Sequence, residues 1–156
     1  MLRQYMKTKV KLSAECLIAF IAAVAAGCSG GGSTVKGKVT LDGNPIGARA
    51  KVEFEPVDPK AGLNGCVVFT KDDGTFEYSP PKAAFSLKPG KYKVFISRMV
   101  DKDGNVPTDD DPGQLEMAGK LKNQVSMKYY NRQQPQFTVD ITGGTNDLPP
   151  FELKSK

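Results

Sequence analysis

The stretch from residue 99 to residue 136 holds the side chains with the most scope for chemistry. Asp101, Asp103 and the run Asp109–Asp111 could offer oxygen ligands to a hard cation such as calcium. Their spacing differs from that of an EF-hand loop, because Gly104 comes too early and no glutamate closes the loop. We therefore favour a solvated turn and a helix-capping aspartate, and we expect no metal and no cofactor.

A second group is aromatic. Tyr129 and Tyr130 stand next to Asn131 and Arg132 and could form a stacking platform for a sugar ring. The alternative is half-buried packing, which is common for tyrosines where a loop enters a strand. We favour packing, and we keep both tyrosines as candidate binding residues.

The 156-residue chain contains no histidine. This removes the base of Ser–His–Asp and Cys–His nucleophiles, the histidine ligands of zinc, and a switch near neutral pH. Cys66 lies in an apolar stretch that suits a small hydrophobic residue, and no histidine is present to activate its thiol. A hydrolase built on two carboxylates would depend on spatial pairing, and nothing in the sequence indicates one. We therefore expect a protein that is not an enzyme.

The first 27 residues have the pattern of an export signal. Basic residues precede the ten-residue apolar run Leu17–Ala26, which is too short to cross a bilayer of about 30 Å as a helix. The small residues before Cys28 resemble a bacterial lipobox, which implies that residues 1–27 are removed and that Cys28 is lipidated. The alternative is an ordinary secretory signal in which Cys28 is incidental. Residues 28–34, rich in glycine and serine, are predicted to form a flexible tether.

Charge follows the same division of the chain. Residues 1–27 contain four basic residues and one acidic residue, so their removal lowers the net charge from +5 to +2. A nearly neutral mature chain lacks the basic surface that nucleic-acid binding requires. We expect an exported protein, lipid-anchored to a bacterial membrane and facing the periplasm or the cell surface. Its partner would be an envelope protein or a polysaccharide.

Beyond the tether the hydrophobic pattern has a period of two, which is typical of β-strands. Residues 64–70 are more continuously apolar, which predicts burial on both faces. Asp73 and Gly74 predict a hairpin turn. The predicted fold is an all-β, seven-stranded antiparallel Greek-key sandwich over residues 35–156. Its strands are residues 35–41, 50–55, 64–70, 75–78, 91–98, 137–142 and 151–153.

The connection at residues 99–136 is too long for a simple turn. Asp111 and Pro112 have the form of a helix N-cap followed by proline at the first helical position. Leu115, Ala118 and Leu121 then recur every third residue, which predicts one or two helical turns.

Several motifs resemble those of transthyretin-like, carboxypeptidase regulatory-like domains. These are a Val-x-Gly-x-Val strand at Val35–Val39, an Asp-Gly-x-Phe turn at Asp73–Phe76, and Leu-x-Pro-Gly-x-Tyr at Leu87–Tyr92. The resemblance covers essentially the whole mature chain, and its C-terminal part is similar to that of small bacterial lipoproteins that carry this domain. It implies a non-catalytic accessory sandwich. One enzyme of this fold, a hydroxyisourate hydrolase, depends on histidines and a C-terminal motif that this chain lacks.

Together these observations predict an envelope lipoprotein that presents a β-sandwich for structural or protein-interaction roles. The alternative is a carbohydrate-binding module on the same fold. The strands of a sandwich are committed to its core, so recognition is expected on the long connection. The candidate binding residues there are Asp109, Asp110, Tyr129 and Tyr130. A connection that merely covers an open sheet edge is the alternative.

Overall fold

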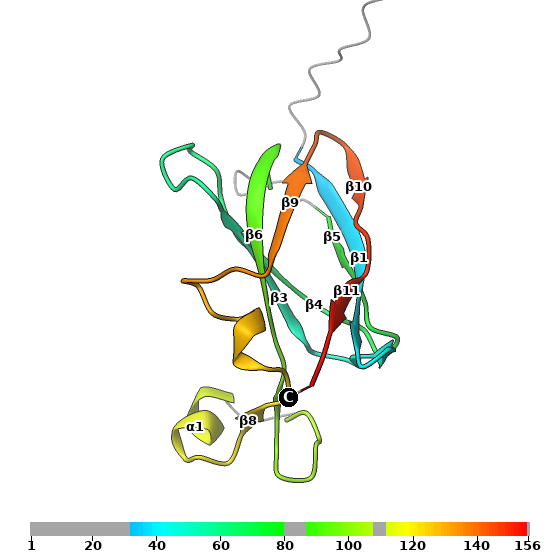
Figure 1. Cartoon of the computed structure of the whole chain (residues 1–156), viewed down its shortest axis with the longest axis vertical. Helices are drawn as coiled ribbons and strands as arrows, with labels where there is room; N and C mark the ends of the chain where they lie inside the picture. Colours follow the sequence, from blue (N-terminus) through cyan, green and yellow to red (C-terminus); the bar gives the residue numbers. More distant parts are fainter. Residues whose placement is uncertain (1–31, 80–86, 108–111, 156) are drawn as a thin grey trace, which may run out of the picture.

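Two β-sheets packed face to face make up nearly all of the regular structure (Figure 1). The structure is a computed structural model, and it describes residues 32–79, 87–107 and 112–155. The predicted signal segment and Cys28 lie outside these ranges. The described chain is an all-β sandwich, and all seven predicted strands are present.

The first sheet is built around β1 (Thr34–Leu41), with β10 and β11 along one side and β5 and β2 along the other. β1 pairs antiparallel with β2 and β5 but parallel with β10 and β11. The prediction of a purely antiparallel fold was therefore wrong for this sheet. The flanking strands are β2 (Asn44–Pro45), β5 (Thr75–Tyr78), β10 (Thr145–Asp147) and β11 (Phe151–Leu153).

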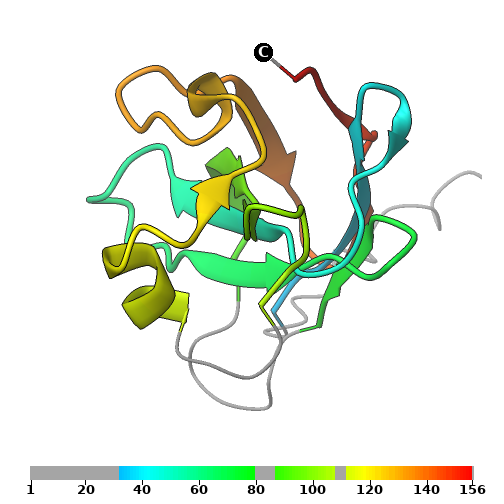
Figure 2. The same ribbon diagram turned by 90° about the horizontal axis from the view of Figure 1, so that it is seen from below.

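The second sheet is antiparallel throughout, in the order β4-β3-β6-β9. Its strands are β4 (Cys66–Phe69), β3 (Lys51–Pro56), β6 (Gly90–Ser97) and β9 (Phe137–Ile141). Figure 2 shows α1 (Pro112–Met117) and β8 (Lys122–Asn123) of the long connection on the side of this sheet, away from β1 and β11. β4 and β9 are the two edges of the second sheet.

The core lies between the sheets and follows the alternation in the sequence. On β3 the inward Val52 and Phe54 are buried, and the outward residues remain partly exposed. Aromatic rings cross the core in a chain with centroid separations of 5.0–6.2 Å. Such contacts stabilise a core beyond the area they bury. The rings belong to Phe54, Phe76, Phe151, Phe137 and Tyr129.

Two of the sequence motifs meet at Gly37 and Phe76. A Cβ atom added to Gly37 would lie 2.5 Å from Cζ of Phe76, so only glycine leaves room for this ring. Asp73 and Gly74 form the predicted turn, in which the Asp73 carboxylate accepts hydrogen bonds from N and Oγ1 of Thr75 at 2.9 and 2.7 Å. The strands on either side do not form the predicted hairpin, however, because β4 pairs with β3 and β5 pairs with β1.

The folded domain begins earlier than the predicted boundary at residue 35. Ser33 is fully buried, and its hydroxyl donates a hydrogen bond to the Thr142 carbonyl oxygen at 2.7 Å. Its backbone N–H donates to the Leu87 carbonyl oxygen at 2.8 Å. Ser33 and Thr34 therefore belong to the sandwich rather than to the tether.

Candidate functional site

The described parts of the connection, residues 99–107 and 112–136, lie mainly along the outer face of the second sheet (Figure 2). β7 (Met99–Val100) and β8 (Lys122–Asn123) form a short antiparallel ribbon. The predicted short helix is confirmed as α1 (Pro112–Met117). A 3-10 turn, η1 (Met127–Tyr129), then leads toward β9. Asp109, Asp110 and Asp111, which the sequence analysis singled out, lie outside the described residues.

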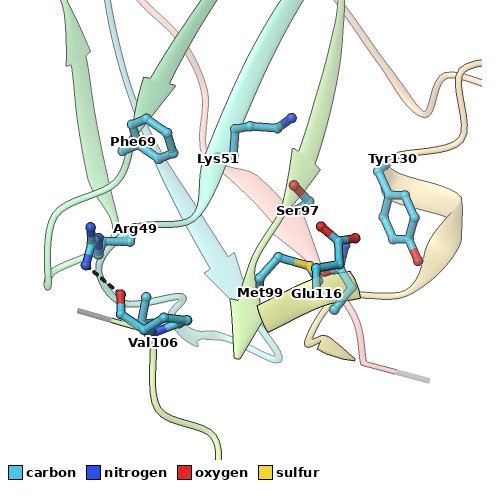
Figure 3. A pocket seen from close by; sticks show the side chains of 10 residues that line it. Arg49, Lys51, Phe69, Ser97, Met99, Val106, Glu116 and Tyr130 are labelled. Atoms are coloured by element: carbon cyan, nitrogen blue, oxygen red, sulfur yellow. Dashed lines mark hydrogen bonds between the residues drawn. The ribbon is translucent and has the colours of Figure 1, made fainter. Parts of the chain in front are cut away.

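An open pocket of about 640 Å³ lies where this connection meets the sheet. Its floor is one row of side chains across three strands, because Lys51 of β3 is in register with Phe69 of β4 and with Ser97 of β6. Figure 3 shows Phe69 and Tyr130 on opposite sides of this floor. The size and the largely apolar lining are typical of small-molecule sites and of pockets that receive a side chain. The lining residues are Arg49, Lys51, Phe69, Ser97, Met99, Val106, Pro107, Glu116, Asn123 and Tyr130.

The charged groups of the pocket come from three segments. Arg49 donates from Nη1 to the Pro107 carbonyl oxygen at 2.6 Å (Figure 3), and its backbone N–H donates to the Thr70 carbonyl oxygen at 2.9 Å. Lys51 Nζ lies 3.2 Å from Glu53 Oε2. Glu116 of α1 supplies the carboxylate of the lining. Charged groups of both signs therefore line the pocket, and Arg49 and Lys51 already have partners within the protein.

The two adjacent tyrosines have different surroundings. Tyr129 is buried, its ring stacks on Phe137 at 5.9 Å, and its hydroxyl oxygen accepts a hydrogen bond from the Lys154 N–H at 2.8 Å. Tyr129 is therefore a core residue, and its place among the candidate binding residues is corrected. Tyr130 is half-buried and lines the pocket.

Arg132 fastens the connection to the outer face of the sheet. Nη2 donates to Glu53 Oε1 at 2.7 Å, Nη1 donates to Glu55, and the guanidinium carbon lies 5.3 Å from the centroid of the Phe95 ring. Partial burial raises the pKa of Glu53, but hydrogen bonds from Arg132 and Lys51 outweigh this and hold the pKa below its ordinary value. Phe95 faces outward from the sheet and is nevertheless only 4% exposed.

The acidic residues at the start of the connection form a turn. The Asp101 carboxylate accepts hydrogen bonds from the backbone N–H groups of Asp103 and Asn105, both at 2.8 Å. These bonds, led by that from Asn105, lower the pKa of Asp101. The Asp101 carboxylate thus stabilises the local backbone, in agreement with the solvated turn that we favoured over a cation site. In the described residues no group of three or more His, Cys, Asp or Glu side chains is arranged to hold a metal ion.

β4 differs from its predicted environment. Val67 is 47% exposed and Phe69 57% exposed, so the expected burial of residues 64–70 on both faces was wrong. The strand is an edge, and its outward side chains face the pocket region or solvent. Cys66, on the inward side, is half-buried, and burial raises the pKa of its thiol to about 12. It packs against the core as the small hydrophobic residue that the sequence predicted.

The sequence reasoning found Tyr130 but missed the floor of the pocket. Lys51 and Phe69 were interpreted only as strand residues, and Arg49 was given no role. The outward direction of Lys51 could be predicted from the alternation on β3, but the position of β4 at an edge could not. That position depends on strand order, for which the sequence offers no local signal.

Comparisons with known proteins complete the description. No protein-family model matches the chain, and no curated protein matches it. Among solved structures, the chain is similar to a DUF3823 family protein from Parabacteroides merdae, with 19% sequence identity and a TM-score of 0.37. The likeness covers 80% of this chain and 45% of that protein, so the chain spans less than half of its length. Residues 32–79, 87–107 and 112–155 include no helix with the length and apolar character to cross a membrane.

Proposed function

We propose that this chain is a non-catalytic lipoprotein of a bacterial envelope, whose β-sandwich presents the pocket beside the long connection to an envelope partner. The observation that carries the binding role is the pocket, which joins the exposed Phe69 of an edge strand to Tyr130 of the connection. An exposed aromatic side chain on such a concave surface is typical of recognition sites.

The envelope location is argued from the sequence. A basic segment, a ten-residue apolar run and small residues before Cys28 favour export and lipidation. Two acyl chains on Cys28 would anchor the protein stably, because each buried CH₂ contributes about 0.8 kcal/mol. The motifs shared with transthyretin-like, carboxypeptidase regulatory-like domains also favour a non-catalytic role.

The anchor is tested by Cys28→Ser, with Cys66→Ser as the matched control. In the bacterial host, Cys28→Ser is expected to abolish labelling with a fatty acid and to shift the protein from the membrane fraction to the soluble fraction. Cys66→Ser is expected to change neither. Unchanged labelling and fractionation of Cys28→Ser would show that the anchor assignment is wrong.

A carbohydrate ligand is the second candidate, since Phe69 and Tyr130 line the same pocket as Glu116 and Asn123. The two candidates are separated by binding of the tagged full chain to envelope preparations. If the partner is a protein, protease treatment of the preparation abolishes binding and periodate oxidation of its sugars does not. The reverse result would favour the carbohydrate-binding module. Binding to neither the intact nor the treated preparations would contradict the proposed function.

A further inference from the structure

The two edges of the second sheet differ in chemistry. On β9 the exposed side chains are Thr138 and Asp140, whereas on β4 they are Val67 and Phe69. Natural proteins protect exposed edges with polar or charged side chains, because an apolar edge invites pairing with another strand. β9 has this protection and β4 does not.

The backbone of β4 also presents unpaired hydrogen-bonding groups. Thr70 donates its N–H to the Ala50 carbonyl oxygen at 3.0 Å, and Val68 is in register with Val52. Hydrogen-bonded pairs alternate along an antiparallel ladder, so the N–H and C=O groups of Val67 and Phe69 point away from β3. Within the described part of the chain, no residue forms a hydrogen bond with these groups.

The pocket adjoins the exposed edge of β4. Phe69 belongs to both the edge and the pocket lining. In a strand added along β4, alternate side chains would lie on the outer face beside Val67 and Phe69. A residue opposite Phe69 would therefore have its side chain at the mouth of the pocket.

The charge of the pocket selects among such strands. Lys51, in register with Phe69, lies 3.2 Å from Glu53, which also has Arg132 Nη2 as a partner at 2.7 Å, so Lys51 can turn to a second carboxylate without leaving Glu53 unpaired. An acidic side chain at this end of an added strand is favoured over a basic one. Alternate side chains of a strand share a face, so the acidic residue and the apolar residue beside Phe69 lie two positions apart.

We propose that β4 receives an extended peptide segment of a partner protein as a fifth strand of the second sheet. An apolar side chain of this segment lies beside Phe69, and a carboxylate two positions along the segment, on the same face, lies toward Lys51. Backbone hydrogen bonds to Val67 and Phe69 provide the pairing, and the pocket provides the selectivity. This inference rests on the proposed function, because it names the chemistry of the envelope partner.

The test selects from a phage-displayed library of random nine-residue peptides, with the full chain as bait. The expected consensus has apolar residues at alternating positions and at least one acidic residue. The synthetic consensus peptide is expected to bind Phe69→Lys at least tenfold more weakly than the wild type and Thr138→Lys, the matched change on β9, within twofold. Lys51→Gln is expected to reduce the preference for this peptide over a version with lysine in place of its acidic residue.

Two measurements separate strand addition from simple adhesion to an apolar patch. In hydrogen exchange, the bound peptide is expected to slow exchange of the Val67 and Phe69 amides at least tenfold, with no change in β9. Two peptides are methylated on their backbone nitrogens, one at the odd positions and the other at the even positions. Methylation of the nitrogens that pair with β4 is expected to abolish binding, and methylation of the other set is expected to leave binding intact. No enrichment above that on Phe69→Lys, or equal binding by both methylated peptides, would overturn the inference.

The experiments distinguish a wrong strand-addition inference from a wrong proposed function. If the library yields nothing while envelope preparations still bind the chain, only the strand-addition inference is wrong. If the wild type is a dimer in gel filtration and Val67→Lys is a monomer, the occupant of β4 is a second copy, which also overturns the peptide assignment. Protease-resistant, periodate-sensitive binding to the envelope would assign the site to a polysaccharide instead.

Discussion

Arg132 Nη2 donates a hydrogen bond to Glu53 Oε1 at 2.7 Å, although the two residues are 79 positions apart in the chain. The contact joins the end of the long connection to the outer face of β3, and it covers Phe95. It thus fixes the wall that carries Tyr130 against the floor that carries Lys51 and Phe69, so the pocket depends on it.

Arg132→Ala is expected to destabilise the domain by about 1 kcal/mol at pH 7, because a partly exposed ion pair and the cover over Phe95 are lost. The pKa of Glu53 is lowered from 4.5 in the folded state. The stabilisation that the Glu53 carboxylate provides is therefore complete above its pKa in the unfolded chain. It is lost as the pH falls through its lower pKa in the folded chain. In urea unfolding, the difference in the free energy of unfolding between Arg132→Ala and the wild type should shrink below about pH 4.5. Lys102→Ala, which breaks a far more exposed pair with Asp103, should show no such difference.

Gly37→Ala is expected to destabilise the fold by about 1–3 kcal/mol, because the new Cβ would lie 2.5 Å from the Phe76 ring. Gly143→Ala is the control, since no atom lies within 4 Å of its added Cβ. Urea midpoints measure both changes. Phe76→Leu in the Gly37→Ala background should cost less than Phe76→Leu alone, and simple additivity would argue against the close approach.

Tyr129→Ala and Tyr130→Ala form a matched pair of neighbours. Tyr129→Ala is expected to cost about 3–5 kcal/mol of stability, because it removes a buried ring and the acceptor for the Lys154 N–H. Tyr130→Ala is expected to cost about 1 kcal/mol or less and to weaken binding of the envelope partner. Equal losses of stability in the two variants would contradict their assignment to core and pocket.

Cys66 is expected to react slowly with a thiol reagent at pH 8, because burial raises its pKa to about 12 and leaves little thiolate. The measurement requires Cys16→Ser and Cys28→Ser so that only one thiol remains. The rate should rise by at least a hundredfold in denaturing urea. A rate that urea does not change would mean that the inward face of β4 is open to solvent.

Local alternation predicted the seven strands well, because the side chains of each strand must divide between the core and the outer face. It could not predict strand order, so the parallel pairing of β1 and the edge position of β4 were missed. For the same reason the exposure of Phe69 was unexpected. Tyr129 and Tyr130 are identical neighbours in sequence, and only the path of η1 separates the core residue from the pocket residue.

The central claim is that the partner contacts the pocket side of β4, and site-specific photo-crosslinking tests it most directly. A benzoylphenylalanine replaces Phe69 in one full-length variant and Thr138 in another, and intact cells are irradiated. We predict one crosslinked envelope protein for position 69 and none for position 138. Equal crosslinking at the two positions, or crosslinking only at position 138, would contradict the account.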